Sequence, residues 1–264
     1  MLKLENVWKT FHPGTVNEKI ALRGVDLHLK PGDFVTVIGG NGAGKSTMLN
    51  SVAGVFGIET GKILVDGKDI THLPGYKRAK YIGRVFQDPM MGTAATMQIE
   101  ENLALAARRG MPRTLRQGIT SAERERYREQ LKVLDLGLED RLTTKVGLLS
   151  GGQRQALTLL MATLTEPKVL LLDEHTAALD PKTADKVLEA TEKIVTANNL
   201  TTMMITHNMR DAIDHGNRLI MMYDGRIVID VSGEEKKRLT VPELLELFSQ
   251  VSGSDEADDK LLLG

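Results

Sequence analysis

The segment GGNGAGKST, residues 39–47, constrains the fold more than any other part of the chain. It follows the apolar, β-branched run DFVTVIG and precedes MLNSVAGVF, whose apolar residues recur at helical spacing. A glycine-rich turn between a strand and a helix can point backbone N–H groups inward, and the helix N-terminus adds a dipole that favours an anion. The pattern G-x-x-x-x-G-K-[S/T] in this setting therefore predicts a phosphate-binding loop in an α/β fold.

The side chains of this loop indicate a nucleotide bound together with magnesium. Lys45 can reach the β- and γ-phosphates, and the hydroxyl of Ser46 can bind Mg²⁺. The alternative is a glycine-rich turn without a ligand, but it leaves both side chains at the required positions unexplained. The candidate binding residues of the loop are Gly39, Asn41, Gly42, Ala43, Gly44, Lys45, Ser46 and Thr47.

The run VLLLDE, residues 169–174, is apolar up to two consecutive carboxylates. An uninterrupted aliphatic run predicts a buried parallel strand, and ligands bind at the C-terminal ends of such strands in open α/β sheets. Asp173 is the candidate for the magnesium shell, and Glu174 is the candidate to orient or deprotonate the attacking water. A helix cap would explain one acidic residue here, but it leaves the pairing with a phosphate loop as a coincidence.

Four further side chains are weaker candidates. His207 ends the strand-like run TTMMITH, and Gln87 follows a short strand, so both can point into the same crevice. A lone histidine is more often structural than catalytic, and a single glutamine carries little information. Phe11 and Trp8 can stack on a base, although core packing explains either aromatic equally well.

Composition excludes several classes of protein. The chain has 264 residues, of which 41% are hydrophobic and 26% charged, as in an ordinary globular protein. Its 34 basic and 35 acidic residues give no bulk attraction to nucleic acid. It has no cysteine, so disulfides and thiolate metal sites are excluded. We find no secretory signal, and no apolar run approaches the roughly 18 to 20 residues that cross a bilayer, so any crossing would fall to another subunit.

The order of the predicted elements indicates a single domain over residues 1–250. Short strands dominate residues 2–37, whereas residues 96–150 are charged, amphipathic and poor in strands, which indicates an inserted helical subdomain. After this insertion, strands alternate with helices of 10 to 15 residues, as in a mainly parallel sheet covered on both faces. Residues 251–264 are acidic, and we expect a flexible tail there.

The segment LSGGQRQ, residues 149–155, has the composition of a second phosphate-binding element, although a nucleotide has one triphosphate. The phosphate loop, Gln87, LSGGQ, VLLLDE, the ALD segment of residues 178–180 and His207 follow one another in an order that resembles the ATP-binding-cassette (ABC) ATPases. The resemblance covers roughly residues 2–231. It implies a P-loop α/β core with an antiparallel β subdomain and a helical subdomain, which agrees with the organisation above.

The resemblance also implies roles for the candidate residues, with ATP and Mg²⁺ as cofactors. Gln87, Glu174 and His207 correspond to hydrolysis residues. Ser46, Gln87 and Asp173 correspond to the metal site. Phe11 occupies the adenine-stacking position, where tyrosine is commoner, and stacking should survive this change because the ring makes the contact.

In this family two cassettes pair head to tail, which accounts for the second glycine element. The residues Ser150, Gly151, Gly152 and Gln153 of one subunit would close over the ATP held by the other, and Asp180 would lie in a loop that communicates across the interface. Glycines permit close backbone approach, and a helix N-terminus favours the γ-phosphate charge. Hydrolysis would remove the shared anion and let the homodimer reopen.

The chain departs from the common pattern at two places. The segment LSGGQ is the signature segment of this family. The helix after it contains ALTLLMATLTEPKV, where many transport cassettes have arginine, and His175 follows Glu174 where proline is usual. Neither change touches the catalytic atoms. The run from LSGGQ to ALDP is similar to a bacterial group that accompanies amino-acid-type importers.

The resemblance implies the ATPase subunit of a multi-chain transporter, peripheral on the cytoplasmic face of the cell membrane. Its partners would be a permease subunit and, for an importer, an extracellular substrate-binding protein. Met90, Met91 and Met97 are candidates for the permease-docking surface, although they could equally fill the core of the helical subdomain. An exporter subunit, a soluble cassette acting on ribosomes or DNA, and a nucleotide-holding scaffold are the alternatives. The neutral charge, the single cassette and the intact Glu174 and His207 disfavour the last two.

Overall fold

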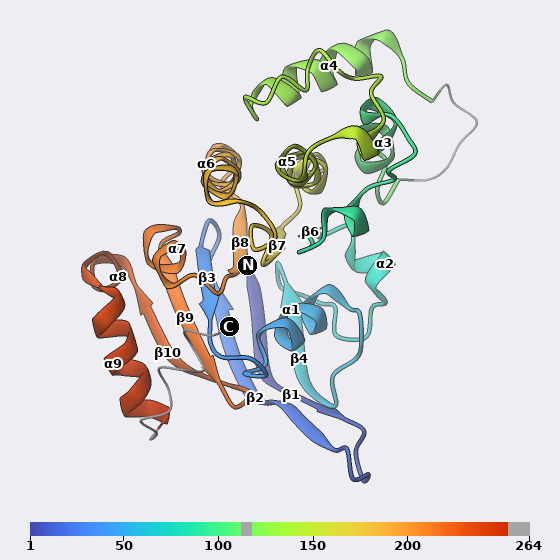
Figure 1. Cartoon of the computed structure of the whole chain (residues 1–264). Coiled ribbons are helices and arrows are strands. Elements are labelled where there is room, and N and C mark those ends of the chain that lie inside the picture. Colours follow the sequence, from blue (N-terminus) through green and yellow to red (C-terminus); the bar gives the residue numbers. More distant parts are fainter. Residues whose placement is uncertain (112–117, 253–264) are drawn as a thin grey trace.

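The computed structural model describes residues 1–111 and 118–252, which form two sheets surrounded by helices (Figure 1). The smaller sheet is antiparallel, with the strand order β2-β1-β4-β5. Its strands are β1 (Leu2–Phe11), β2 (Lys19–Leu29), β4 (Thr60–Val65) and β5 (Lys68–Asp69). In β1 the side chains of Leu2, Leu4 and Val7 are buried, whereas that of Lys3 is exposed, as expected for a sheet with one face on the core.

The larger sheet has the order β10-β9-β3-β8-β7-β6 and is parallel except for the β9–β10 hairpin. Its strands are β3 (Phe34–Ile38), β6 (Ile82–Val85), β7 (Val169–Asp173), β8 (Thr201–Ile205), β9 (Arg218–Tyr223) and β10 (Arg226–Ser232). The aliphatic run of β7 is fully buried, which a strand covered on both faces requires. This confirms the predicted mainly parallel core.

Helices cover the two faces of the core sheet differently. On one face, Leu171 of β7 packs in a cluster with Met48 of α1 (Lys45–Ala53) and with the antiparallel sheet. On the other face, Leu172 packs with Leu159 of α5 (Gly151–Thr163) and with α6 (Pro181–Ala197). The helices α1 and α5 therefore lie on opposite faces of the core sheet.

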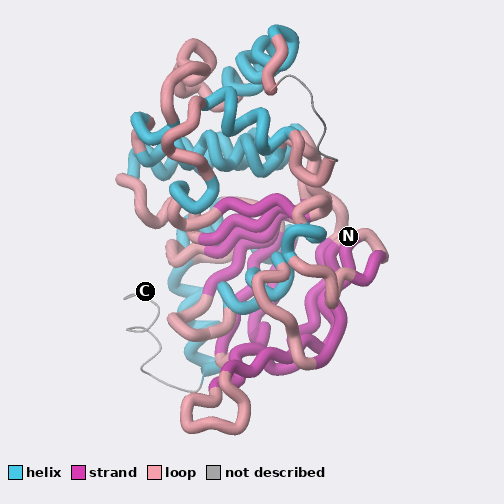
Figure 2. Tube along the Cα trace, turned by 90° about the vertical axis from the view of Figure 1, so that its right-hand side faces the viewer, coloured by secondary structure: helices cyan, strands magenta, loops and turns pink. Residues whose placement is uncertain are grey.

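The segment between β6 and β7 is helical, as the sequence predicted. Its helices are α3 (Ile99–Ala107) and α4 (Ser121–Lys132), which pack with α5 to form a helical lobe above the strands (Figure 2). Leu103, Tyr127 and Leu131 form part of its buried core. A capping box at Thr120 begins α4: its side chain accepts from the backbone N–H of Glu123, whose carboxylate accepts from the N–H of Thr120.

The remaining helices are short or lie near the C-terminus. They are α2 (Gly75–Arg78), α7 (Met209–Asp214), α8 (Gly233–Arg238) and α9 (Val241–Ser252), with 3₁₀ turns at Pro89–Gly92 and Val146–Leu148. The sequence did not predict α8, because GEEKKR has no apolar stripe. Burial of Lys236, whose ammonium donates to the carbonyls of His215 and Gly216, holds α8 in place. The predicted acidic tail lies almost entirely outside the described residues.

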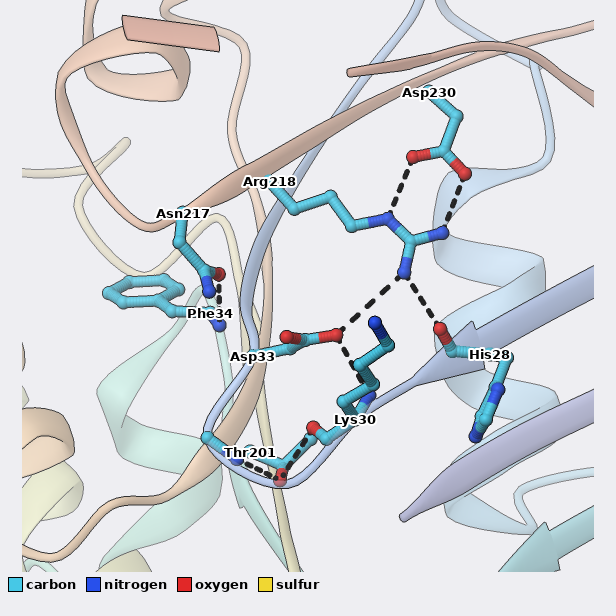
Figure 3. A network of polar contacts seen from close by, with 9 residues as sticks. His28, Lys30, Asp33, Phe34, Thr201, Asn217, Arg218 and Asp230 are labelled. Carbon is cyan, nitrogen blue, oxygen red and sulfur yellow. Dashed lines mark hydrogen bonds and ion pairs between the residues drawn. The ribbon is translucent and has the colours of Figure 1, made fainter. Parts of the chain in front are cut away.

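Arg218 joins the two sheets at the end of β3 that is remote from the phosphate loop (Figure 3). Its guanidinium makes a bidentate pair with Asp230 at 2.6 and 2.7 Å and donates to the carbonyl of His28 at 2.7 Å. Asp33 lies 3.8 Å away at the start of β3. Because the bonds from one planar group reach β10 and β2, Arg218 fixes the antiparallel sheet against the core.

Candidate functional site

The loop between β3 and α1 runs between two other strands, and its glycines are required for that passage. Gly39 has a φ of 144° and Gly44 a φ of 106°, backbone conformations that residues with a side chain rarely adopt. A Cβ atom on Gly39 would overlap the carbonyl oxygen of Met222, and one on Gly44 would lie 2.7 Å from the carbonyl oxygen of Ala21. The two glycines therefore let the loop pass close to the backbone of the neighbouring strands β9 and β2.

Lys45 stands at the mouth of this loop and is 5% exposed. Its Nζ donates to the carbonyls of Gly39 at 2.6 Å and Gly40 at 3.2 Å. Burial lowers the pKa of Lys45, while the nearby carboxylates of Glu174 and Asp173 oppose that shift. Within residues 1–111 and 118–252 no carboxylate lies in ion-pair contact with Lys45, so its charge is directed to the loop.

Glu174 and His207 come from neighbouring parallel strands and meet at the same sheet edge. Asp173 pairs with Ile205 in register, and each strand continues for one or two residues to reach them. The Nε2 atom of His207 lies 2.5 Å from Oε1 of Glu174. Glu174 has φ 47°, a left-handed conformation that is costly for a residue with a side chain. The structure thus brings together the acid and the imidazole that the sequence proposed separately.

Asp173 has a partner that the sequence analysis missed. Its Oδ2 accepts from Nη2 of Arg84 at 2.9 Å, and both side chains are 16% exposed. The guanidinium also lies 4.5 Å from the ring centroid of Phe86, the residue that follows β6. The available signal was a charged residue inside the otherwise apolar strand YIGRVF, three residues before Gln87.

Gln87 follows β6 and is exposed. No hydrogen bond joins its side chain to Asp173 or Glu174 in the part of the chain that the structure describes. The residue before it, Phe86, accepts a 3.0 Å hydrogen bond at its carbonyl from Nε2 of Gln155 on α5. The structure therefore ties the Gln87 loop to the signature helix rather than to the carboxylates.

The two aromatic candidates have different surroundings. Trp8 donates from Nε1 to Oδ1 of Asn6 at 2.9 Å, and its indole covers Gly24 of β2. Phe11 is half-buried at the end of β1, edge-on to Phe56 with centroids 5.3 Å apart. Trp8 is thus part of the packing of the antiparallel sheet, and the Phe11 ring contacts Phe56 and has its centroid 5.3 Å from Nζ of Lys9.

The donor atoms of the site fit ATP with magnesium. Ser46 and Gln87 are exposed and Asp173 is partly exposed, so a hydroxyl, an amide and a carboxylate oxygen are available, which are the ligand types that Mg²⁺ prefers. Among the described residues no three His, Cys, Asp or Glu side chains form a metal cluster.

The signature segment begins α5, on the opposite face from α1. Ser150 is the exposed N-cap: its Oγ accepts from the N–H of Gln153, and the Gln153 side chain accepts from the N–H of Ser150, each at 3.2 Å. Gly151 is exposed, whereas Gly152 is buried. Asp180 is likewise the exposed N-cap of α6, and its bonds to Thr183 lower the pKa of its carboxyl. Both helix N-termini thus face solvent.

A groove of about 1890 Å³ opens beside the edge strand β6, between α1 and the helical lobe. Its apolar lining includes Val55, Tyr76, Phe86, Met91, Met97 and Leu105. Met91 is 70% exposed and Met90, next to it, is 45% exposed, so these two methionines do not fill the core of the lobe. Met97 is half-buried in the groove wall.

Comparison with known proteins decides the family. The ABC transporter family model matches residues 22–177, which are more than half of the chain. The chain belongs to the ABC transporter family. It is an ATP-binding ATPase subunit, as the sequence predicted.

Several proteins are similar to this cassette over nearly its whole length. A tyrosine transport ATP-binding protein of Clostridioides difficile is 45% identical over 94% of the cassette and 98% of that protein. An energy-coupling factor transporter ATP-binding protein of Clostridium acetobutylicum is 31% identical over 95% of the cassette and 89% of that protein. A dimeric ATP-binding cassette solved in a post-hydrolysis state with ADP and Pi has a TM-score of 0.75 and 31% identity, over 88% of this cassette and 98% of that chain. These likenesses confirm the predicted fold.

Proposed function

We propose that the cassette hydrolyses ATP at the site formed by residues 39–47, Asp173, Glu174 and His207, and that hydrolysis drives a multi-chain importer. The observation that carries the site assignment is the 2.5 Å contact between Glu174 and His207, close to the buried Lys45. A carboxylate held by an imidazole beside a phosphate cradle is suited to orient a water for in-line attack.

Each side chain of the site would act on a different part of the reaction. The loop amides and Lys45 bind the phosphates, and Phe11 stacks on the adenine. Ser46, Gln87 and Asp173 would hold magnesium, which neutralises charge on the transferring phosphoryl group when bound. Glu174 orients or deprotonates the water, and His207 keeps that carboxylate in position.

The test is substitution of Glu174 by Gln, which keeps the shape and removes the charge. We expect ATP binding to stay within about twofold and turnover to fall by roughly 10² or more, the scale of lost general-base catalysis. Glu189→Gln, an exposed change on α6, is the matched control. Turnover by Glu174→Gln at the rate of the control would remove Glu174 from this role.

The active unit that we propose is a head-to-tail homodimer in which Ser150, Gly151 and Gly152 of one subunit close over the ATP of the other. Supporting it are the exposed N-terminus of α5 and the location of α5 and α1 on opposite faces of the sheet. A mixture of Lys45→Ala and Ser150→Arg subunits should regain one competent composite site, whereas neither variant alone is active. If LSGGQ served its own chain, mixing would restore nothing.

The groove beside β6 is the proposed docking site for a permease, which would hold the cassette on the cytoplasmic face of the membrane. Among residues 1–111 and 118–252, no helix is long and apolar enough to span a bilayer. Exposed methionines such as Met91 suit a partner helix. The 45% identical tyrosine transport ATP-binding protein supports an amino-acid transporter. We further propose that the transporter is an importer served by an extracellular binding protein.

Cross-linking tests this docking. The chain lacks cysteine, so Met91→Cys carries a single thiol in the groove, and Val16→Cys carries one on a fully exposed loop as the control. Met91→Cys should cross-link to a transmembrane subunit in membranes of the source cells, and Val16→Cys should not. Equal yields from both positions would contradict docking in the groove.

A further inference from the structure

We propose that Arg84 is the resident counter-ion of Asp173, which neutralises this carboxylate when no metal is bound and competes with the divalent cation that accompanies ATP. The inference rests on the proposed metal role of Asp173. Arg84 thereby sets how tightly the cassette binds that cation.

The register of β6 and β7 brings Arg84 and Asp173 together. Arg84 lies on β6, where it is in register with Leu171, so its side chain is on the same face of the sheet as Asp173 two residues further along β7. Nη2 reaches Oδ2 at 2.9 Å. A full positive charge therefore lies within hydrogen-bond distance of an oxygen that a metal or its water shell would use.

The guanidinium of Arg84 uses only some of its hydrogen-bond donors. The Nε of Arg84 is buried and has no hydrogen-bond partner among the described residues. An arginine that served only to join β6 to β7 would be expected to use more of its donors, as Arg218 does. Asp173 thus holds Arg84 by one bond, which a divalent cation can replace.

Arg84 also contacts an aromatic ring besides Asp173. Its guanidinium lies over the ring of Phe86 at 4.5 Å, and both side chains line the groove beside β6. Stacking on an aromatic face supports an arginine without a carboxylate. The guanidinium of Arg84 can therefore separate from Asp173 and keep its contact with the Phe86 ring.

The sign of the effect follows from like-charge repulsion. A positive charge next to the carboxylate disfavours a second cation there, and loss of Arg84 removes the cation that is in contact with Asp173. Removal of Arg84 should therefore destabilise the metal-free cassette and tighten divalent binding. A role limited to fixing the Asp173 rotamer predicts weaker binding instead.

The experiment measures Mn²⁺ binding by the decrease of its free electron-paramagnetic-resonance signal, with the non-hydrolysable analogue AMP-PNP present. Arg84→Met should bind Mn²⁺ about threefold to tenfold more tightly than the unaltered cassette, because a neighbouring charge is screened but not abolished at a partly buried site. Arg84→Lys keeps the charge and should stay near the unaltered value. Arg124→Met, which breaks the ion pair with Glu100 in the helical lobe, is the control and should change nothing.

The outcomes separate this inference from the proposed function. Unchanged or weaker Mn²⁺ binding by Arg84→Met overturns the counter-ion role, whereas unchanged binding by Asp173→Asn overturns the metal role of Asp173 itself. Thermal unfolding gives a second readout that also serves Arg84→Gln, should the methionine variant fold poorly. For either Arg84 variant, the rise in Tm on adding Mn²⁺ and AMP-PNP should be larger than the rise for the unaltered cassette, and an equal rise would contradict the inference.

Discussion

Gly152 of the signature segment packs directly against Thr183 of α6. A Cβ atom built on Gly152 would overlap Cγ2 of Thr183, and Gly152 is buried. The second glycine of the segment is therefore required by the packing of α5 on α6 within one subunit. Its neighbour Gly151 is exposed, and a Cβ atom built there would meet only the end of the flexible Leu179 side chain, at 3.3 Å.

Gly152→Ala should destabilise the monomer by about 1–3 kcal/mol, the cost of overpacking, although alanine favours a helix. Thr183→Ser removes the clashing methyl and should restore most of the loss in the double variant. Gly151→Ala is the control and should change stability by less than about 0.5 kcal/mol. Urea unfolding measures all four, and a stable Gly152→Ala that fails only in dimer assembly would contradict the packing role.

His175 should make the cassette lose stability in acid. The ring is 2% exposed, and burial, with a smaller effect from His215, lowers its pKa to about 4. Nε2 lies 3.1 Å from the hydroxyl of Thr191, which itself donates to the carbonyl of Val187, so the neutral ring donates there. Since the folded chain binds fewer protons than the unfolded chain between pH 4 and about 6.5, the free energy of unfolding falls as pH falls through this window.

At pH 4 the loss in free energy of unfolding caused by His175 should reach about 3 kcal/mol, because its pKa is shifted by roughly 2.5 pH units and each unit corresponds to about 1.4 kcal/mol. We expect His175→Gln to flatten the dependence of unfolding free energy on pH between 6.5 and 4. His12→Gln, an exposed change, should leave it intact. Parallel curves for the unaltered chain and His175→Gln would show that another group causes the acid loss.

Arg78 anchors the C-terminal end of α1, the helix that begins with Lys45. The side chain is 2% exposed, and it donates to four backbone carbonyls at 2.6–2.8 Å, those of Ser51, Val52, Thr71 and Leu73. Lysine cannot reproduce this planar fork, so Arg78→Lys should cost about 2–4 kcal/mol through unsatisfied buried carbonyls. Thermal unfolding checks this, with the exposed Lys77→Ala as the control, and equal Tm values for the two would refute the anchor.

The elements and the nucleotide site could be predicted because their signals are local. The glycines of residues 39–47, the aliphatic run before Asp173 and the amphipathic pattern of α6 each depend on neighbours in sequence. The meeting of Glu174 with His207 followed once both were assigned to parallel strand ends. The residue-level roles at the site stay predictions that the experiments above test.

Long-range partners could not be predicted in this way. Nothing near Arg84 in the sequence indicates that it pairs with Asp173, because β6 and β7 are separated by the whole helical lobe. The burial of Lys236, which places α8, likewise depends on carbonyls of residues 215 and 216. The overlap of Gly152 with Thr183 is a contact between two helices whose faces the sequence does not pair.

Glu174 should be held at a cost in stability, because its φ of 47° is unfavourable for any residue with a Cβ. Glu174→Gly should therefore be more stable than Glu174→Ala by about 1 kcal/mol, the reverse of the order at ordinary positions. The matched control is Glu166, which has the same φ of 47° but follows α5 away from the carboxylates. Glu166→Gly should likewise be more stable than Glu166→Ala, and it should keep full ATPase activity. Differential scanning calorimetry of the four variants measures both differences. If alanine proved the more stable only at position 174, the left-handed conformation of this residue would be wrong, and with it the orientation of the carboxylate toward His207.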